Sequence, residues 1–107
     1  MDMKVHIPED IREYEPELRF FFDTMIRKLH INKHKGFAAD NNPERIVKRI
    51  NEEMAELRDA LNNESQFEVF LEAVDVANFA WLLGVVVFRM DRDKFQTEQQ
   101  RNKNYVT

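Results

Sequence analysis

The segment from Ala73 to Phe88 is apolar nearly throughout, and only Asp75 and Asn78 interrupt it. A helix that is apolar on almost every side has to be covered on almost every side. A chain of 107 residues that offers two further good helices has little material for that purpose. We therefore expect an all-α bundle that is completed by oligomerisation, as a homodimer or a homotetramer.

The composition agrees with a helical protein. The chain is 43% hydrophobic and 34% charged, with 2 Gly and 3 Pro, which argues against disorder and against a loop-rich β fold. Its length predicts one domain, residues 1–107, with a core at about 16–90 and a polar tail at 91–107.

Several classes of protein are disfavoured. The absence of cysteine excludes a disulfide scaffold and thiolate metal ligands. The N-terminus lacks the apolar core of a signal peptide, and the segment 73–88 looks too short and too polar for a membrane span. A net charge of −4 argues against binding to duplex nucleic acid. We expect a cytoplasmic protein, in the host cytoplasm if a phage encodes it.

Local patterns predict where the helices begin and end. Residues 1 to about 13 are expected to be irregular, and a first helix should run from about Pro16 to near Gly36, a plausible C-terminal stop. Apolar residues recur along it at helical spacing. They are Leu18, Phe21, Phe22, Met25 and Leu29.

Two more helices follow, and the tail is expected to form a short fourth one. Asn42 and Pro43 favour a start as N-cap and first helical residue, and this helix should reach about Leu61. Ser65 with Glu68 three residues later makes a capping-box pattern, which predicts a helix at about 66–90. The second helix has an apolar stripe at Ile46, Ile50, Leu57 and Leu61.

Carboxylates form two pairs on the second and third helices. Glu53 and Glu56 are three residues apart, as are Glu72 and Asp75, so each pair shares one helical face. A solvated surface cluster is the ordinary explanation for Glu residues, but it fits poorly for Asp75, which is enclosed by apolar neighbours. Antiparallel packing across residues 62–65 would bring the pairs together as a metal site.

The ligand types narrow the choice of metal. Carboxylate oxygens suit Mg²⁺ or Mn²⁺ better than Zn²⁺. The chain contains no Glu-x-x-His motif of the kind that di-iron bundles use. Because Mg²⁺ usually shares its coordination shell with substrate phosphates, the pattern favours phosphate chemistry.

The same residues resemble a known family. Glu-Glu-x-x-Glu at 52–56 followed by Glu-x-x-Asp at 72–75 resembles the MazG-like all-α nucleoside triphosphate pyrophosphohydrolase superfamily. Within it, the segments Lys28–Gly36 and Glu72–Ala80 are similar to phage and bacterial dATP/dGTP diphosphohydrolase-type members. The resemblance covers about residues 18–90.

The resemblance implies a reaction and roles for the acids. A (deoxy)nucleoside triphosphate, with dGTP or dATP as the expected substrates, would be cleaved between its α and β phosphates to give a monophosphate and pyrophosphate. The family would place Mg²⁺ on the four paired acids, Glu53, Glu56, Glu72 and Asp75. Glu52, beside Glu53, would orient or deprotonate the attacking water.

Other polar residues are candidates for substrate binding. His34 and Lys35 lie where the family places substrate contacts, although both would also suit a helix C-terminus. Asn78, and less strongly Asn32, could bind the nucleoside, or could join two helices by a hydrogen bond. Lys103 could reach the triphosphate from the tail, or could simply be solvated.

Two other functions remain open at this point. One is a dUTPase- or dCTPase-like all-α hydrolase that uses the same metal scaffold on another base. The other is a non-catalytic helical protein that binds a partner through its apolar third helix. Base preference depends on the shape of the binding site and a few polar contacts, which the sequence does not supply.

Overall fold

The computed structural model describes residues 3–36, 42–63 and 65–101, which contain helices and no strand. A 3₁₀ helix η1 (Glu9–Tyr14) leads into α1 (Glu15–Lys33). Helices α2 (Pro43–Asn63), α3 (Gln66–Met90) and α4 (Arg92–Arg101) follow. The all-α prediction is confirmed. The irregular lead-in was wrong for residues 9–13, which form η1, with an ion pair of 2.9 Å between Arg12 and Glu9.

The predicted signals for the ends of the helices are present in the structure. Asn42 Oδ1 accepts a hydrogen bond from the Arg45 amide at 3.1 Å, and Ser65 Oγ accepts one from the Glu68 amide at 3.3 Å. Each bond satisfies an amide that has no partner within its own helix. Beyond α1, Gly36 adopts a φ of 78°, a left-handed conformation that glycine tolerates best.

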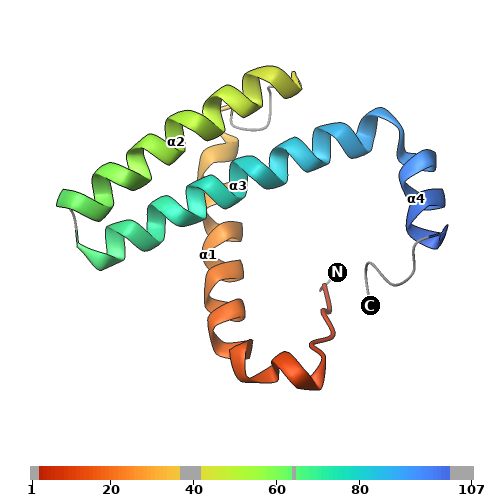
Figure 1. The fold of residues 1–107 in the computed structure, drawn as a ribbon, viewed down its shortest axis with the longest axis horizontal. Helices are drawn as coiled ribbons and strands as arrows, with labels where there is room; N and C mark the ends of the chain where they lie inside the picture. The colour runs from red at the N-terminus through yellow and green to blue at the C-terminus, as the bar shows by residue number, and fades with distance from the viewer. Residues whose placement is uncertain (1–2, 37–41, 64, 102–107) are drawn as a thin grey trace.

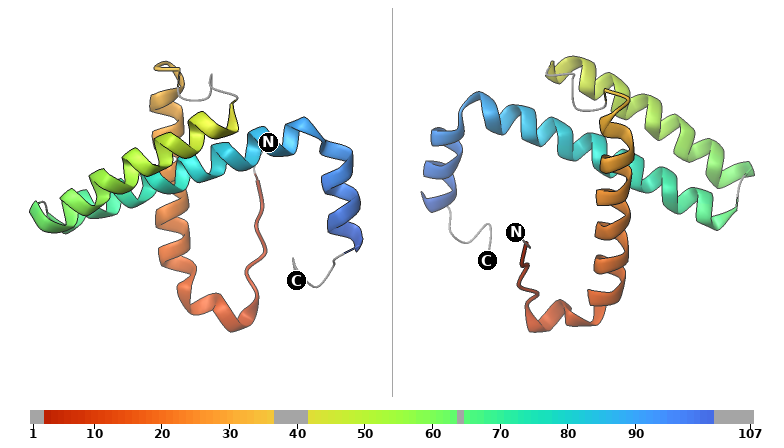
Figure 2. Two further views of the ribbon diagram at one scale, coloured as in Figure 1. Left: turned by 45° about the horizontal axis from the view of Figure 1, so that its top comes forward. Right: turned by 180° about the vertical axis from the view of Figure 1, so that it is seen from behind.

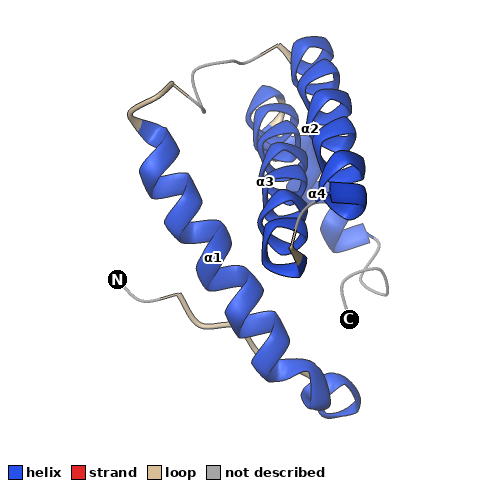
Figure 3. Ribbon diagram, turned by 90° about the vertical axis from the view of Figure 1, so that its left-hand side faces the viewer, coloured by secondary structure: helices blue, strands red, loops and turns tan. Residues whose placement is uncertain are grey.

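Helices α2 and α3 form the framework, and α1 crosses them. Figure 1 shows α2 and α3 lying side by side and antiparallel, while α1 crosses α3 steeply near its middle. The N-terminal half of α1 and all of α4 extend to the same side of α3 in both views of Figure 2. Figure 3, turned by 90° from the view of Figure 1, shows α2 and α3 side by side, with α1 on one side of the pair.

The apolar core lies between α2 and α3. Ile46, Phe79 and Leu82 are buried together, and partly buried residues from three helices pack against them. On α2 the predicted stripe holds as far as Leu57, but Leu61 was placed wrongly and is 65% exposed. The inward positions step by four, three, four and three residues, so Ala60 takes the place predicted for Leu61.

The stripe on α1 is shifted from the one that the sequence predicted. Leu18 and Phe22 are exposed, whereas Phe21, Met25 and Leu29 are partly buried as expected. Phe21 packs edge-on against Phe70 of α3, with ring centroids 5.6 Å apart. The physical reason is the steep crossing angle, because a helix that crosses another buries only a short patch at the contact.

Much of the apolar surface of α3 remains uncovered within the described chain. Trp81, Phe88 and Met90 are all exposed. Among the described helices, α3 alone is long and apolar enough to cross a membrane, a test that the core helix of a soluble protein also passes. The prediction that this segment is too short and too polar to span a membrane is therefore not confirmed.

Candidate metal centre

The antiparallel packing of α2 and α3 brings acids from both helices together. Glu53 and Glu56 of α2 and Glu72 of α3 each offer a carboxylate oxygen, and these oxygens lie within 4.8 Å of one another. Glu53 and Glu72 are partly buried, while Glu56 is exposed. Three of the four acids predicted as ligands thus form one cluster at the helix–helix seam.

Helical spacing explains why these acids face the seam. Glu53 falls between Ile50 and Leu57 on the inward positions of α2, so the helix turns its carboxylate towards α3. On α3, Glu72, Asp75 and the buried Phe79 follow one another at intervals of three and four residues. The three side chains therefore lie on the same face of the helix. The acids are therefore part of the packed face of each helix.

Unpartnered oxygens test whether a cation fits this cluster. Glu53 Oε2 and Glu72 Oε2 are buried and accept no hydrogen bond from the described residues. Buried carboxylate oxygens are costly unless a cation or donors compensate them. A divalent cation with a preference for oxygen ligands would satisfy both atoms at once, so the residues present fit Mg²⁺ or Mn²⁺.

The electrostatics of the cluster raise two pKa values. The pKa of Glu53 rises from 4.5 to about 7, chiefly because burial removes its carboxylate from water. A hydrogen bond shared with Glu56 and repulsion from Glu56, Asp75 and Glu72 raise it further. Burial and repulsion from Asp75 and Glu56 also raise the pKa of Glu72. The positive charge of Lys28 lowers that pKa and so partly offsets the rise. Like charges in one partly buried site resist joint ionisation.

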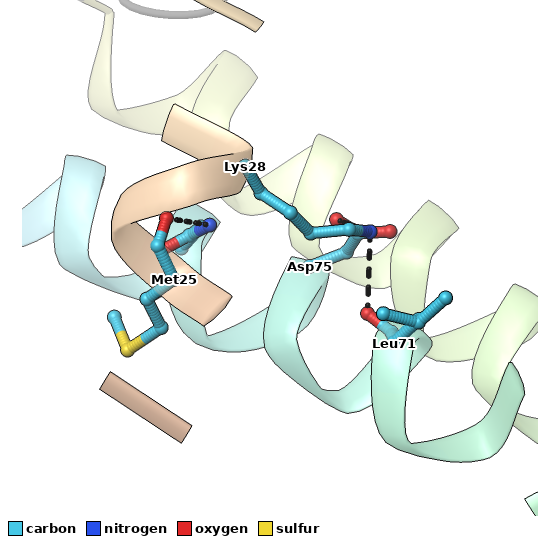
Figure 4. A network of polar contacts seen from close by, with 5 residues as sticks. Met25, Lys28, Leu71 and Asp75 are labelled. Carbon is cyan, nitrogen blue, oxygen red and sulfur yellow. Dashed lines mark hydrogen bonds and ion pairs between the residues drawn. The ribbon is translucent and has the colours of Figure 1, made fainter. Parts of the chain in front are cut away.

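Asp75, the fourth predicted ligand, lies beside the cluster and is paired with a lysine from α1. Lys28 Nζ donates to Asp75 Oδ1 at 2.7 Å and approaches the Leu71 carbonyl oxygen at 3.5 Å (Figure 4). Lys28 was not among the predicted site residues. It lies three residues after Met25 and four before Asn32, so its inward position could have been read from the helical spacing.

The other predicted site residues are distributed unevenly. Asn78 is 2% exposed, and its Nδ2 donates to the Met25 carbonyl at 3.3 Å, while its Oδ1 has no partner among the described residues. Asn32 is partly buried one turn beyond Lys28. The remaining candidates are exposed or lie outside the described residues.

Glu52, His34 and Lys35 are exposed, and among the described residues no hydrogen bond or ion pair joins them to the clustered acids. His34 lies just after the last residue of α1, which agrees with the alternative that it suits a helix C-terminus. Lys103 lies outside the described residues.

A second cation, Arg49, stacks on an aromatic ring of α3. The guanidinium carbon of Arg49 stands 4.6 Å from the centroid of the Phe79 ring. Arg49 is one turn before Glu53 on α2, and Phe79 is one turn after Asp75 on α3. The stacked guanidinium is therefore held by a residue that follows Asp75 by one turn, while Arg49 itself precedes Glu53 by one turn.

Comparison with known proteins identifies the class to which this fold and site belong. The chain matches the phosphoribosyl-ATP pyrophosphohydrolase family over residues 19–102, which covers α2, α3, α4 and most of α1. The chain belongs to this family, a MazG-like all-α family of pyrophosphohydrolases. Enzymes of this family typically use divalent metals. No curated protein and no solved structure matches the chain. The superfamily predicted from the sequence is confirmed, and the dATP/dGTP subtype stays a prediction.

In the metal-free protein, the free energy of unfolding should fall as the pH rises through about 7, because of Glu53. Its carboxyl releases a proton near pH 4.5 when unfolded and about 7 when folded. Its stabilising contribution is thus complete below the unfolded pKa and lost as the pH passes the folded pKa. Urea unfolding with a chelator, over this range, measures the effect.

Glu53→Gln should remove this part of the pH dependence. Glu52→Gln, which removes an exposed carboxylate from the same turn, is the matched control and should retain it. The same pH slope in the wild type and in both variants would contradict the role given to Glu53.

Proposed function

We propose that this protein is a Mg²⁺-dependent (deoxy)nucleoside triphosphate pyrophosphohydrolase. It cleaves between the α and β phosphates and releases a (deoxy)nucleoside monophosphate and pyrophosphate, with the purine substrates dGTP and dATP preferred. The observation that supports it best is the convergence of Glu53, Glu56 and Glu72. Glu53 and Glu72 each have a buried oxygen that no described residue satisfies. Membership of a pyrophosphohydrolase family supports the same class of reaction.

Each acid has a role in this proposal. Glu53, Glu56, Glu72 and Asp75 would hold the ion, which when bound supplies positive charge and Lewis acidity at the phosphates. Glu52 is exposed beside Glu53, where it is open to solvent and able to accept a proton from an attacking water. Catalysis would depend mainly on positioning and on charge compensation.

Basic and amide side chains around the acids would bind the rest of the substrate. Arg49 is held on the Phe79 ring close to the centre and is suited to a phosphate oxygen. Asn78 Oδ1 is an unused acceptor one turn from Asp75 and is suited to a hydroxyl of the nucleoside. His34, Lys35, Asn32 and Lys103 remain proposed contacts.

A second candidate substrate comes from the family match. The family takes its name from phosphoribosyl-ATP, which is itself a nucleoside triphosphate. The acid cluster would serve either substrate, because it acts on the phosphates and not on the base. Phosphoribosyl-ATP therefore belongs in any test of the activity.

We also propose that the protein acts in the cytoplasm as a homodimer or homotetramer. The described chain leaves large apolar side chains of α1, α3 and α4 exposed, a pattern typical of a surface covered by another subunit. They include Leu18, Phe22, Ile26, Trp81, Phe88 and Phe95. The family is one of soluble enzymes, which favours burial of α3 in protein over burial in a membrane.

Incubation with each dNTP, each NTP and phosphoribosyl-ATP in the presence of Mg²⁺ should release pyrophosphate from at least one of them. The acids act at the α–β linkage, so single phosphates should not appear, and a chelator should stop the reaction. Separate assays for pyrophosphate and phosphate distinguish the outcomes. A folded protein that turns over none of these substrates would refute the enzyme, and release of single phosphates would refute the cleavage position.

Glu56→Gln and Asp75→Asn should each lower kcat by about 100-fold or more, because each removes a carboxylate from the metal centre. Circular dichroism should show the helical content unchanged, because both changes keep the size of the side chain. Asp59→Asn, an exposed acid one turn further along α2, is the matched control. Near-normal turnover in either centre variant would show that the metal ligands are assigned wrongly.

Sedimentation velocity should give the mass of a dimer or tetramer of the 12.9 kDa chain. Trp81→Glu should reduce that mass, because it places a charge on an exposed apolar side chain of α3, which a partner would bury. Gln96→Glu on the exposed surface of α4 is the control. A wild-type protein that stays monomeric at the concentrations of the activity assay would contradict the proposal.

A further inference from the structure

Lys28 is the residue near the centre whose role the proposed reaction leaves unexplained. It belongs to α1, whereas the clustered acids belong to α2 and α3. Its side chain is 23% exposed and that of Asp75 is 22% exposed, so the pair is largely withdrawn from solvent. A charge in that position is costly unless it is compensated, which makes the 2.7 Å contact more than a surface ion pair.

The geometry ties the ammonium group to one acid in particular. Lys28 Nζ contacts Asp75 Oδ1 and lies 3.5 Å from the carbonyl oxygen of Leu71. Figure 4 shows the side chain reaching from α1 across to α3, with its nitrogen between these two oxygens. Asp75 is also the acid that does not join the convergence of Glu53, Glu56 and Glu72.

The negative charges around Lys28 explain its position beside the acids. Glu53 and Glu72 are each repelled by neighbouring acids, and Asp75 acts on both. Lys28 partly offsets that repulsion at Glu72, so its charge is felt beyond the residue it touches. The positive charge of one cation inside a group of four acids stabilises the folded chain, because it attracts the acids. The same charge opposes the entry of a second cation, because it repels that cation.

We propose that Lys28 is the internal counter-cation of the centre and competes with the divalent ion for Asp75. This inference rests on the proposed metal centre and adds to it a residue that sets its affinity for the metal. Lys28 stabilises the metal-free fold and weakens metal binding. A residue that only supported the structure would, on removal, weaken both.

The test measures Mn²⁺ binding and metal-free stability in the same set of full-length proteins. Free Mn²⁺ is followed by electron paramagnetic resonance during titration, and thermal unfolding is recorded in the presence of a chelator. Lys28→Met should bind Mn²⁺ about tenfold more tightly, because one competing unit charge is removed from a partly buried site. The same variant should unfold at a lower temperature than the wild type.

Two further variants separate charge from packing. Lys28→Arg keeps the positive charge and should bind Mn²⁺ within about twofold of the wild type. Lys33→Met makes the same change at an exposed lysine of α1, where solvent screens the charge, and should also stay within about twofold. Should Lys28→Met not fold, Lys28→Gln removes the charge and keeps a hydrogen-bonding group, and the same tighter binding is expected of it.

The outcomes distinguish this inference from the proposed function. Neutral variants at Lys28 that fold and bind Mn²⁺ no more tightly than the wild type would overturn the inference alone. A wild type and variants that all fail to bind Mn²⁺ would overturn the metal centre and the inference together. Tighter Mn²⁺ binding by a protein that hydrolyses no nucleotide would support the inference and refute the proposed function.

Discussion

The structure depends on the apposition of α2 and α3, which presses carboxylates of the two helices against one another. Glu53 and Glu72 are repelled by other acids and contain oxygens that no described residue satisfies. This arrangement is destabilising, and the apolar contacts among Ile46, Phe79 and Leu82 have to offset it. A helical pair selected for stability alone would place apolar side chains at those positions. The positions of the acids therefore support the proposal that they hold a cation.

The position of α1 is coupled to the same acids. Helix α1 makes apolar contacts through Leu29, which packs against the core, and through the rings that contact Phe70. It is also attached to α3 by polar bonds, from Lys28 to Asp75 and from Asn78 to the backbone of Met25. The first of these bonds involves Asp75, so a change in the charge of Asp75 acts directly on one of the contacts that orient α1 (Figure 4). The centre and the packing of α1 against α3 are therefore coupled through Asp75.

The sequence predicted the parts of this structure that depend on local chemistry. Ser65 and Gly36 set helix ends through their own backbones and side chains, and the acid pairs follow from spacing along single helices. The sequence could not predict the contacts that depend on how helices cross. Leu18 was expected to be buried and is exposed, because the steep crossing leaves that end of α1 beyond α3. Lys28 lies on the inward face by its spacing, but only the crossing decides that it meets Asp75.

In the proposed function, the acids and the nucleoside contacts would have separate roles. The clustered acids belong to α2 and α3 and would act on phosphates that every nucleoside triphosphate shares. The nucleoside would be bound by other side chains, and the described chain leaves many apolar side chains of α1 and α3 exposed. If a second subunit covers those apolar groups, it would also be placed to contribute to the nucleoside site. Base preference would then be a property of the assembled protein, and the acids of one chain would favour a class of reaction without specifying the base.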